Sequence, residues 1–435
     1  MWDKAYRPGR AQVARFGSRR YHAPMPSRAD PLKQIAAINR GRNPELLALK
    51  YRKMAATPFG YFRGTNPLFH ADWPGAAWLE RMPAAWLNGD LHIENFGTYR
   101  GDNRLVYFDV GDFDDGALGP LGRDLMRFLV GVHMAGHEMG FGARRASELG
   151  GLFLAAYRAA LIDGKARWIE RRTAGGVIGE LLVKLERRTQ ADLLAKRTVM
   201  RKGKRRLRTD TGKALPLAPA ERARVVAFMK RFAKDRAYPR FFKVLDVAQR
   251  VAGVGALGLK RYVVLVEGDR GHDGAALIDL KTQNGSTLIP RLKQRQPRFD
   301  SEAARVVAIE TRMQAVGPAF LTAARIGGSS FTLRELQPSA DKLDLSTTHP
   351  DRAAFEAVIE SMGALTAWAQ LRCAGRDRAT DIDGLMAFAQ NAGWSRPLIA
   401  LAKDWAKAIF EDWRGFRESK LATWAHAQNG LARRV

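Results

Sequence analysis

Apolar side chains recur every three or four residues over several long stretches of the chain, a spacing that predicts amphipathic helices. In the stretch 121–139, Leu125, Phe128, Leu129 and Val132 would share one buried face. Further helices are expected from Asp30-Pro31, with a break, to about Met54, and over residues 146–162, 301–316, 355–371 and 398–424. These stretches indicate a mainly helical framework.

Shorter runs of β-branched and aromatic residues predict strands. They cover residues 105–110, 260–267, 275–281 and 330–336. In the run 275–281, the two-residue period of a strand would place Leu277, Asp279 and Lys281 on one face. Helices and strands together predict an α+β protein with a mainly helical large lobe and a small lobe built on an antiparallel sheet.

The order of these elements divides the chain into four expected regions. Residues 1–50 would form an N-terminal arm and helix, and residues 51–243 would belong to the large lobe. Residues 244–345 would form the small β lobe, and residues 346–435 would be C-terminal helices packed on the large lobe. Within the second region, residues 165–240 are expected to form a basic helical insertion.

Two short segments have more than one interpretation. The aromatic-rich segment 57–64, TPFGYFRG, is bounded by proline and glycine and is expected to be a packed turn, but its Arg63 could also reach a phosphate. The run 201–208, RKGKRRLR, is the densest in positive charge. It fits a solvated face of the insertion, and it also fits a site for an acidic substrate or a polynucleotide.

Composition narrows the range of partners and compartments. The 435 residues carry a formal net charge of +28, which attracts nucleotides, phosphorylated metabolites, nucleic acid or acidic lipid surfaces. No module that reads RNA or DNA accompanies this charge, so nucleic acid is an open but not a favoured partner. The single cysteine, Cys373, excludes an internal disulfide and indicates a cytoplasmic protein. No apolar run reaches the roughly 18 residues that a membrane span needs.

The stretch 87–124 carries acidic and amide side chains at a spacing that suits a metal–phosphate site. Asp90 and Asn95 are separated by four residues on an expected loop, and the strand at 105–110 runs into Asp112. In phosphoryl transfer one carboxylate positions the acceptor hydroxyl, while an amide and a second carboxylate hold Mg²⁺ against the phosphates. Asp90 is therefore the candidate catalytic residue, and Asn95 and Asp112 are candidate metal ligands.

The run 88–95, NGDLHIEN, resembles the catalytic loop of the aminoglycoside phosphotransferase and choline kinase branch of the protein-kinase-like superfamily. Asp112-Phe113 is similar to the metal-binding Asp-Phe of that branch. Asp124 is similar to the acidic residue that opens the next helix and braces the loop. The resemblance implies ATP and Mg²⁺ as cofactors, with His92 and Asp109 in supporting positions beside Asp124.

Several motifs together resemble more closely the bacterial family called domain of unknown function 2252. They are Pro58-Phe59, Phe62-Arg63-Gly64, GDLHIENFG, FDVGDFDDGALGP and RDLMRFL. The resemblance covers about residues 50–375 and leaves the substrate open.

The glycines Gly253, Gly255 and Gly258 precede the strand expected at 260–267. A Rossmann turn needs a helix after its glycines, so these residues are expected in a hairpin whose backbone can lie over phosphates. On the next strand, Lys281 stands where a kinase-like small lobe carries its phosphate-anchoring lysine.

The expected partner of Lys281 is Glu310, on the helix at 301–316, although Glu302 competes for this role. Because the catalytic loop precedes the glycine hairpin, the order of the motifs is reversed relative to ordinary kinases. The predicted fold is therefore a two-lobed protein-kinase-like fold with a permuted motif order.

Two departures from the related pattern affect the assignment of ligands. Asp109, Asp112, Asp114 and Asp115 crowd together, with Asp112 favoured as the metal ligand and Asp114 second. Asn88 stands where related catalytic loops usually carry histidine, which is expected to weaken the hydrogen-bond support of Asp112.

The function expected from these residues is ATP- and Mg-dependent phosphate transfer to a hydroxyl group of an anionic or small-molecule substrate. Transfer of AMP on the same scaffold stays open, as does a non-catalytic kinase-like protein that binds nucleic acid through its basic surface. A two-metal phosphoesterase is favoured less, because the later histidine motifs of that class are missing. His133 and His137 are four residues apart on one expected helix and could hold zinc or form a structural pair.

Overall fold

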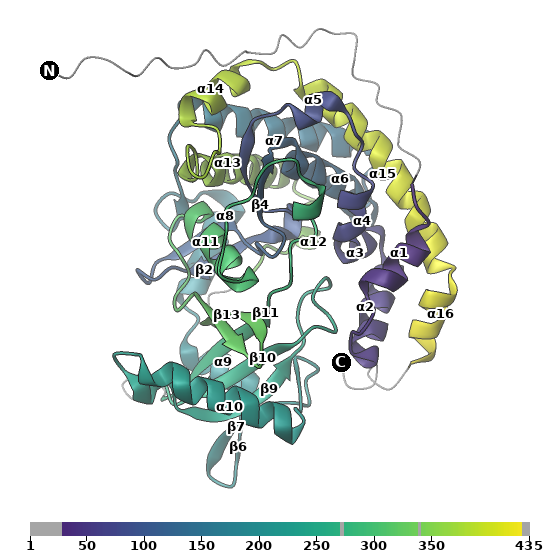
Figure 1. Cartoon of the computed structure of the whole chain (residues 1–435). Coiled ribbons are helices and arrows are strands. Elements are labelled where there is room, and N and C mark those ends of the chain that lie inside the picture. The colour runs from purple at the N-terminus through teal and green to yellow at the C-terminus, as the bar shows by residue number, and fades with distance from the viewer. Residues whose placement is uncertain (1–27, 270–273, 338–340, 429–435) are drawn as a thin grey trace, which may run out of the picture.

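The computed structural model describes residues 28–269, 274–337 and 341–428, and most of the expected N-terminal arm, residues 1–27, lies outside them. The fold is mixed α+β. Helices gather in one part of the molecule, and a six-stranded antiparallel sheet lies in the other (Figure 1). We call these the helical part and the sheet part. One continuous apolar core fills the helical part, and two separate cores cover the two faces of the sheet.

Short helices open the described chain. Asp30 accepts a hydrogen bond from the N–H of Leu32 at 2.9 Å, and Pro31 occupies the first turn, so the chain becomes helical there as expected. The segment 57–64 is a helix and not the expected turn, because Thr57 caps it by accepting the N–H of Gly60 at 3.0 Å. The helices are α1 (Pro31–Ile38), α2 (Pro44–Ala56), α3 (Pro58–Gly64), α4 (Asn66–Ala71) and α5 (Ala77–Glu80).

Short strands and two long helices form the centre of the helical part. β1 pairs with β4, and the β2–β3 hairpin carries β5 at its edge. In the helix α6, the expected apolar face of Leu125, Phe128, Leu129 and Val132 is fully buried. The elements are β1 (Ala84–Leu87), η1 (Ile93–Asn95), β2 (Phe96–Arg100), β3 (Val106–Val110), β4 (Ala117–Pro120), α6 (Gly122–Glu138), α7 (Ala143–Asp163) and β5 (Ile169–Glu170).

The region 165–240, expected to be helical, contains three helices and also short strands. The basic run 201–208 lies mostly in a hairpin whose turn is formed by Lys202 and Gly203, with φ of 49° and 72°. Left-handed values at both positions suit a two-residue hairpin turn. Further on, β8 joins the edge of the six-stranded sheet, and α10 packs on one of its faces. The elements are α8 (Gly176–Glu186), α9 (Gln190–Arg197), β6 (Thr198–Arg201), β7 (Lys204–Leu207), β8 (Ala214–Leu215) and α10 (Pro219–Lys234).

The six strands of the large sheet follow the order β12-β13-β11-β10-β9-β8. In β10, Val264 faces the core under α10, whereas Val263 and Leu265 face the opposite core, which includes Leu194. The elements are η2 (Pro239–Phe242), β9 (Val244–Arg250), β10 (Arg261–Val266), β11 (Ala276–Thr282), η3 (Ile289–Arg291), α11 (Glu302–Met313), β12 (Thr322–Ile326) and β13 (Ser329–Glu335). All four expected strands are present, and α11 connects β11 to β12.

C-terminal helices complete the helical part, and α15 runs along its outer side beside the first helices (Figure 1). The ring of Trp405 stacks on Phe69 with centroids 4.2 Å apart, and His137 packs edge-on against Phe410 at 4.9 Å. The elements are α12 (Leu345–Thr348), α13 (Arg352–Arg372), α14 (Ile382–Gln390), α15 (Ser395–Arg417) and α16 (Lys420–Ala427). No helix within the described ranges is long and apolar enough to cross a membrane.

Candidate functional site

The loop 88–95 between β1 and β2 is organised by two asparagine side chains. Asn88 donates from Nδ2 to the carbonyl oxygens of Gly111 at 3.0 Å and Asp112 at 3.1 Å, and its Oδ1 accepts the N–H of Asp90 at 3.1 Å. Asn95 donates to the carbonyl oxygen of Asp90 at 2.8 Å. The expected weakening at Asn88 is wrong, because its amide supplies both a donor and an acceptor and ties the loop to the backbone of Asp112.

Helix α6 braces this loop through Asp124. The buried carboxylate accepts the N–H of Asn88 at 2.7 Å and the N–H of Gly89 at 2.9 Å. Burial raises the pKa of Asp124 to about 6, and the two backbone donors act in the opposite direction. Asp124 thus fixes the start of the loop without facing a ligand.

Arg127, one turn further along α6, holds the carboxylate of Asp90. Its Nε lies 2.9 Å from Asp90 Oδ1, and the guanidinium also donates to the carbonyl oxygen of Phe62 at 2.8 Å. Burial raises the pKa of Asp90 to about 7, Arg127 opposes that shift, and the carboxylates of Asp115 and Asp112 add to it. The Asp90 side chain is 25% exposed, so a carboxyl group suited to proton exchange near neutral pH is accessible to a ligand.

The side chains of Asp109, in strand β3, and Asp112, just after it, lie in different environments. Asp109 is buried and accepts hydrogen bonds from Arg372 and from the N–H of Ala315, both at 3.1 Å, so it ties β3 to the ends of α13 and α11. Asp112 lies just beyond the strand, with its side chain 55% exposed and a φ of 62°. A left-handed φ is rare outside glycine, and such strained positions cluster at functional sites.

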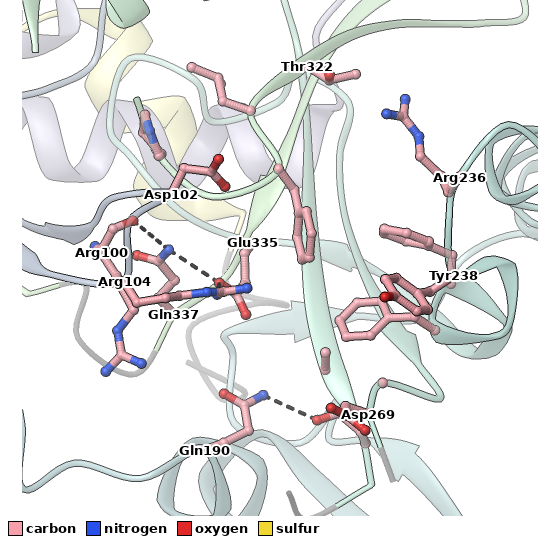
Figure 2. A pocket seen from close by; sticks show the side chains of 18 of the residues that line it. Arg100, Asp102, Arg104, Gln190, Arg236, Tyr238, Asp269, Thr322, Glu335 and Gln337 are labelled. Carbon is pink, nitrogen blue, oxygen red and sulfur yellow. Dashed lines mark hydrogen bonds and ion pairs between the residues drawn. The ribbon is translucent and has the colours of Figure 1, made fainter. Parts of the chain in front are cut away.

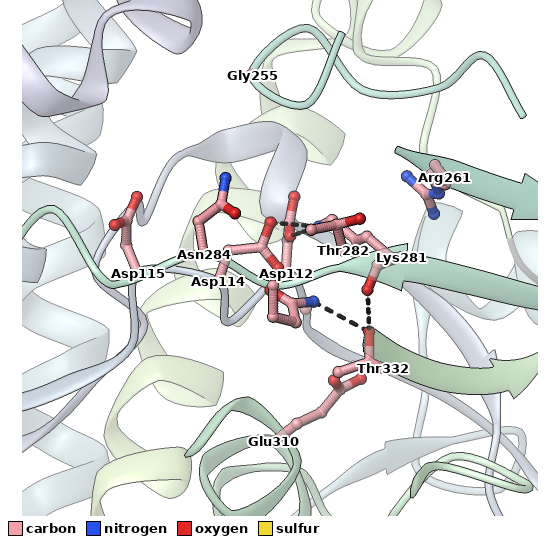
Figure 3. Close-up of polar contacts among 12 residues, drawn as sticks. Asp112, Asp114, Asp115, Gly255, Arg261, Lys281, Thr282, Asn284, Glu310 and Thr332 are labelled. Atoms are coloured by element: carbon pink, nitrogen blue, oxygen red, sulfur yellow. Dashed lines mark hydrogen bonds and ion pairs between the residues drawn. The ribbon is translucent and has the colours of Figure 1, made fainter. Parts of the chain in front are cut away.

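Lys281, from β11 in the sheet part, meets two of the four clustered aspartates (Figure 3). Its Nζ lies 2.6 Å from Asp112 Oδ1 and 2.5 Å from Asp114 Oδ2. Burial would lower the pKa of Lys281, but the two carboxylates raise it above its ordinary value. Burial would also raise the pKa of Asp112, but Lys281 holds it below its ordinary value, whereas burial leaves the pKa of Asp114 raised. Asp112 is therefore the more firmly ionised of the pair.

Asp115 is occupied by donors from the protein itself. Its carboxylate accepts the N–H and the hydroxyl of Thr287 at 2.6 and 2.9 Å, and the amide of Asn66 at 2.8 Å. Arg305 of α11 clamps the same segment by donating to the carbonyl oxygen of Asp114 at 2.6 Å. Of the four crowded aspartates, only Asp112 and Asp114 converge on Lys281.

Glu310 does not pair with Lys281, contrary to the expectation. It lies on α11, separated from the aspartates by Thr332 in Figure 3, and it accepts a hydrogen bond from Arg334 at 3.4 Å. Lys281 instead contacts the carboxylates of Asp112 and Asp114, at 2.6 and 2.5 Å.

The three glycines lie in the connection between β9 and β10, in the hairpin that the sequence predicts. Gly253 and Gly258 have φ of 75° and 86°. Arg42, just before α2, donates to the carbonyl oxygens of Gly255 at 2.8 Å and Leu257 at 2.6 Å. The glycine hairpin is thus fastened to the N-terminal helices, and Figure 3 places Gly255 on the other side of the aspartates from the helix α11.

Arg63, at the end of α3, contacts the loop 88–95 through Glu94. Its Nη1 lies 2.5 Å from Glu94 Oε2, and Lys342 Nζ lies 3.7 Å from the same oxygen. His92 is buried on this loop and accepts the N–H of Glu94 at Nδ1, at 3.2 Å. Burial, with Arg63 and Lys342 nearby, holds the pKa of His92 well below its ordinary value, so this ring is a neutral structural element.

The side-chain oxygen atoms at this site suit a hard divalent cation. Asp112 and Asp114 offer carboxylates beside Lys281. Asn95, on the loop 88–95, donates its amide nitrogen to the carbonyl oxygen of Asp90, and its Oδ1 is a further candidate ligand atom. Mg²⁺ prefers such oxygen donors and takes few of them from protein when phosphates supply others. In the part of the chain that the structure describes, no three His, Cys, Asp or Glu side chains gather as a metal centre, and this holds also at His133 and His137.

A large cavity of about 1640 Å³ lies elsewhere, between the β2–β3 turn, the end of α10 and the β10–β11 turn (Figure 2). Its walls combine arginines such as Arg100 and Arg236 with aromatic rings such as Tyr238 and Phe320. Asp90, Asp112 and Lys281 are not among its lining residues. We take the aspartates as the candidate site, because charged groups and a backbone position with positive φ converge there.

Several residues that form the site could not be identified from the sequence. They are Arg42, Asn66, Thr287, Arg305 and Lys342. Arg127 is different, because it follows Asp124 by three residues in RDLMRFL, a spacing that places both on one helix face.

A family model described as "Uncharacterized protein conserved in bacteria (DUF2252)" matches residues 42–419. The match confirms the family indicated by the motifs, over a longer range than the expected 50–375, and it includes every site residue described above. No curated protein and no solved structure matches the chain.

Proposed function

The chain belongs to the DUF2252 family of bacterial proteins, and we propose that it is a phosphotransferase that moves a phosphate from MgATP to a hydroxyl group. The observation that carries the proposal is the meeting of Lys281 with Asp112 at 2.6 Å across 169 residues of sequence. Strained backbone and charged groups with shifted pKa values cluster at functional sites.

The sheet part supplies the groups that would bind the nucleotide phosphates. The glycine hairpin joins β9 to β10, Lys281 lies on β11, and α11 follows that strand. This succession is that of a kinase-like small lobe, which supports the permuted fold expected from the sequence. Arg42 holds the hairpin in place, and Lys281 would exchange its carboxylate partners for phosphate oxygens when the nucleotide binds.

Asp112, Asp114 and Asn95 would hold Mg²⁺, which neutralises charge on the transferring phosphoryl group. Release of Lys281 toward the phosphates frees both carboxylates for this role. The backbone of Asp112 is fixed by Asn88, and that of Asp114 by Arg305, so the ligands need little reorganisation.

On the acceptor side, Asp90 would orient the hydroxyl group and take its proton. Arg127 fixes the direction of the carboxylate, and the pKa near 7 allows Asp90 to accept a proton near neutral pH. Because positioning and charge stabilisation carry most of the catalysis in this chemistry, no covalent nucleophile is required.

The test is transfer of label from ATP by the purified protein in an extract of small metabolites. We expect label from γ-³²P-ATP, and not from α-³²P-ATP, to appear in a new product that requires Mg²⁺. Asp90→Asn keeps an acceptor for Arg127 and should lose this transfer, whereas Asp163→Asn changes an exposed aspartate paired only with Arg167 and should not. Transfer of the α label would identify AMP transfer, and equal transfer by Asp90→Asn would contradict the assigned role.

A further inference from the structure

Cationic side chains gather near Glu94 on the catalytic loop. Arg63 and Lys342 contact the Glu94 carboxylate directly. The charge of Lys53 interacts with Arg63, with Glu94 and with Lys213. We propose that this basic cluster, Lys53, Arg63, Lys213 and Lys342, binds an anionic group of the acceptor substrate. That this ligand is the acceptor of the phosphate rests on the proposed function.

The cluster carries more positive charge than its internal partner neutralises. Among the residues that the structure describes, Glu94 is the one carboxylate in contact with the cluster, and Lys342 also donates to the backbone oxygen of Glu94. Burial lowers the pKa of Lys53 and of Lys342, and the neighbouring cations add to both shifts. Bringing these cations together is unfavourable unless an anion offsets their repulsion.

Glu94 shows what the cluster can hold. Its carboxylate is 36% exposed and lies 2.5 Å from Arg63, in the position that a carboxylate or phosphate of a ligand would take. A planar guanidinium forms strong, directed hydrogen bonds to such oxyanions. Glu94 therefore acts as an internal stand-in that a ligand anion can displace.

The position of the cluster favours the acceptor over the nucleotide. Glu94 lies on the same short loop as Asp90, the proposed base. Arg63 directly follows Phe62, whose carbonyl oxygen accepts a hydrogen bond at 2.8 Å from Arg127, the partner of Asp90. The proposed phosphate-binding lysine, Lys281, instead contacts Asp112 and Asp114. An acceptor anchored at Arg63 would thus present its hydroxyl beside Asp90.

The experiment is a calorimetric titration of the full chain with inorganic phosphate at constant ionic strength. Glu94→Gln removes the internal anion and should raise phosphate affinity about tenfold, the scale of one hydrogen bond between charged groups. Adding Arg63→Met to that variant should reverse the gain. The matched control is Glu148→Gln, because Glu148 also contacts three arginines, but on the surface away from the loop.

Unchanged affinity in Glu94→Gln, or an equal gain in Glu148→Gln, would overturn the proposal. A second titration with saturating Mg and a non-hydrolysable ATP analogue separates the two sources of the anion. Phosphate binding that persists beside the analogue supports the acceptor site, whereas loss of binding would assign the cluster to the nucleotide. If the analogue itself fails to bind while Glu94→Gln still gains phosphate affinity, the anion site stands and the phosphotransferase proposal falls.

Discussion

Replacing Lys281 with methionine should create a tighter site for a free divalent cation. The lysine holds two carboxylates, at 2.6 Å from Asp112 and 2.5 Å from Asp114. Without it, both would repel each other unless a cation enters between them. The variant should therefore bind Mn²⁺ in the absence of nucleotide more tightly than the wild type, although it should lose nucleotide binding.

The magnitude follows from the exposure of the pair. Unit charges about 4 Å apart attract by about 4 kcal/mol at an effective dielectric constant of about 20. Asp112 is 55% and Asp114 38% exposed, so solvent screening reduces each contact to about 1 kcal/mol or less. Removal of one or two such contacts with Lys281 corresponds to a gain of about 5- to 30-fold in Mn²⁺ affinity.

The assay is titration with Mn²⁺, with free metal followed by electron paramagnetic resonance. Lys243→Met is the control, because Lys243 also pairs with a carboxylate, Glu267 at 3.0 Å, but contacts neither Asp112 nor Asp114. An unchanged Mn²⁺ affinity in Lys281→Met would refute the idea that the lysine occupies a cation position. The same gain in Lys243→Met would mean that the metal binds elsewhere.

Three further results are expected. Burial raises the pKa of Asp90 to about 7, and only its ionised form accepts a proton. The value of kcat/KM for phosphate transfer should therefore rise with pH through about 7. A profile that is flat between pH 6 and 8 would exclude Asp90 as the base. Asp124→Ala leaves two buried N–H groups without acceptors and should lower the free energy of unfolding, measured in urea, by about 2–4 kcal/mol. A loss below about 0.5 kcal/mol would contradict the role of Asp124 in holding the loop 88–95. Gly363→Ala would bring a Cβ within 2.3 Å of the carbonyl oxygen of Phe153 and should cost about 1–3 kcal/mol, whereas Gly415→Ala meets no atom within 4 Å and should cost nothing.

Elements with a clear period were predictable from the sequence. The helix with Leu125 and Phe128 was predictable from apolar residues spaced three or four apart. The strand with Val263 and Val264 was predictable from an unbroken run of β-branched and apolar residues, and both elements are present. The hairpin at 198–207 was missed because its charged residues hid the strand pattern. The turn Lys202-Gly203 was the available signal, since a residue followed by glycine between two short runs favours a tight hairpin.

The contacts of the site were less predictable, because they join segments far apart in sequence. Asp112 and Lys281 each had a local signal, but the choice between Glu310 and the two aspartates as partners of Lys281 depends on distances that only the folded chain sets. Likewise, nothing near Arg42 indicates that it holds Gly255. Long-range pairing of charged groups has no period that a sequence can display.

The most direct test of the central claim is the melting temperature of the protein with and without MgATP. If Lys281 and Asp112 form one nucleotide–metal site, MgATP at 100 times its Kd should stabilise the wild type by about 2.7 kcal/mol. ATP with a metal chelator should stabilise it much less, and Asp112→Asn should melt like the unliganded wild type in either solution. An equal MgATP shift in wild type and in folded Asp112→Asn, or no shift in the wild type, would contradict the account.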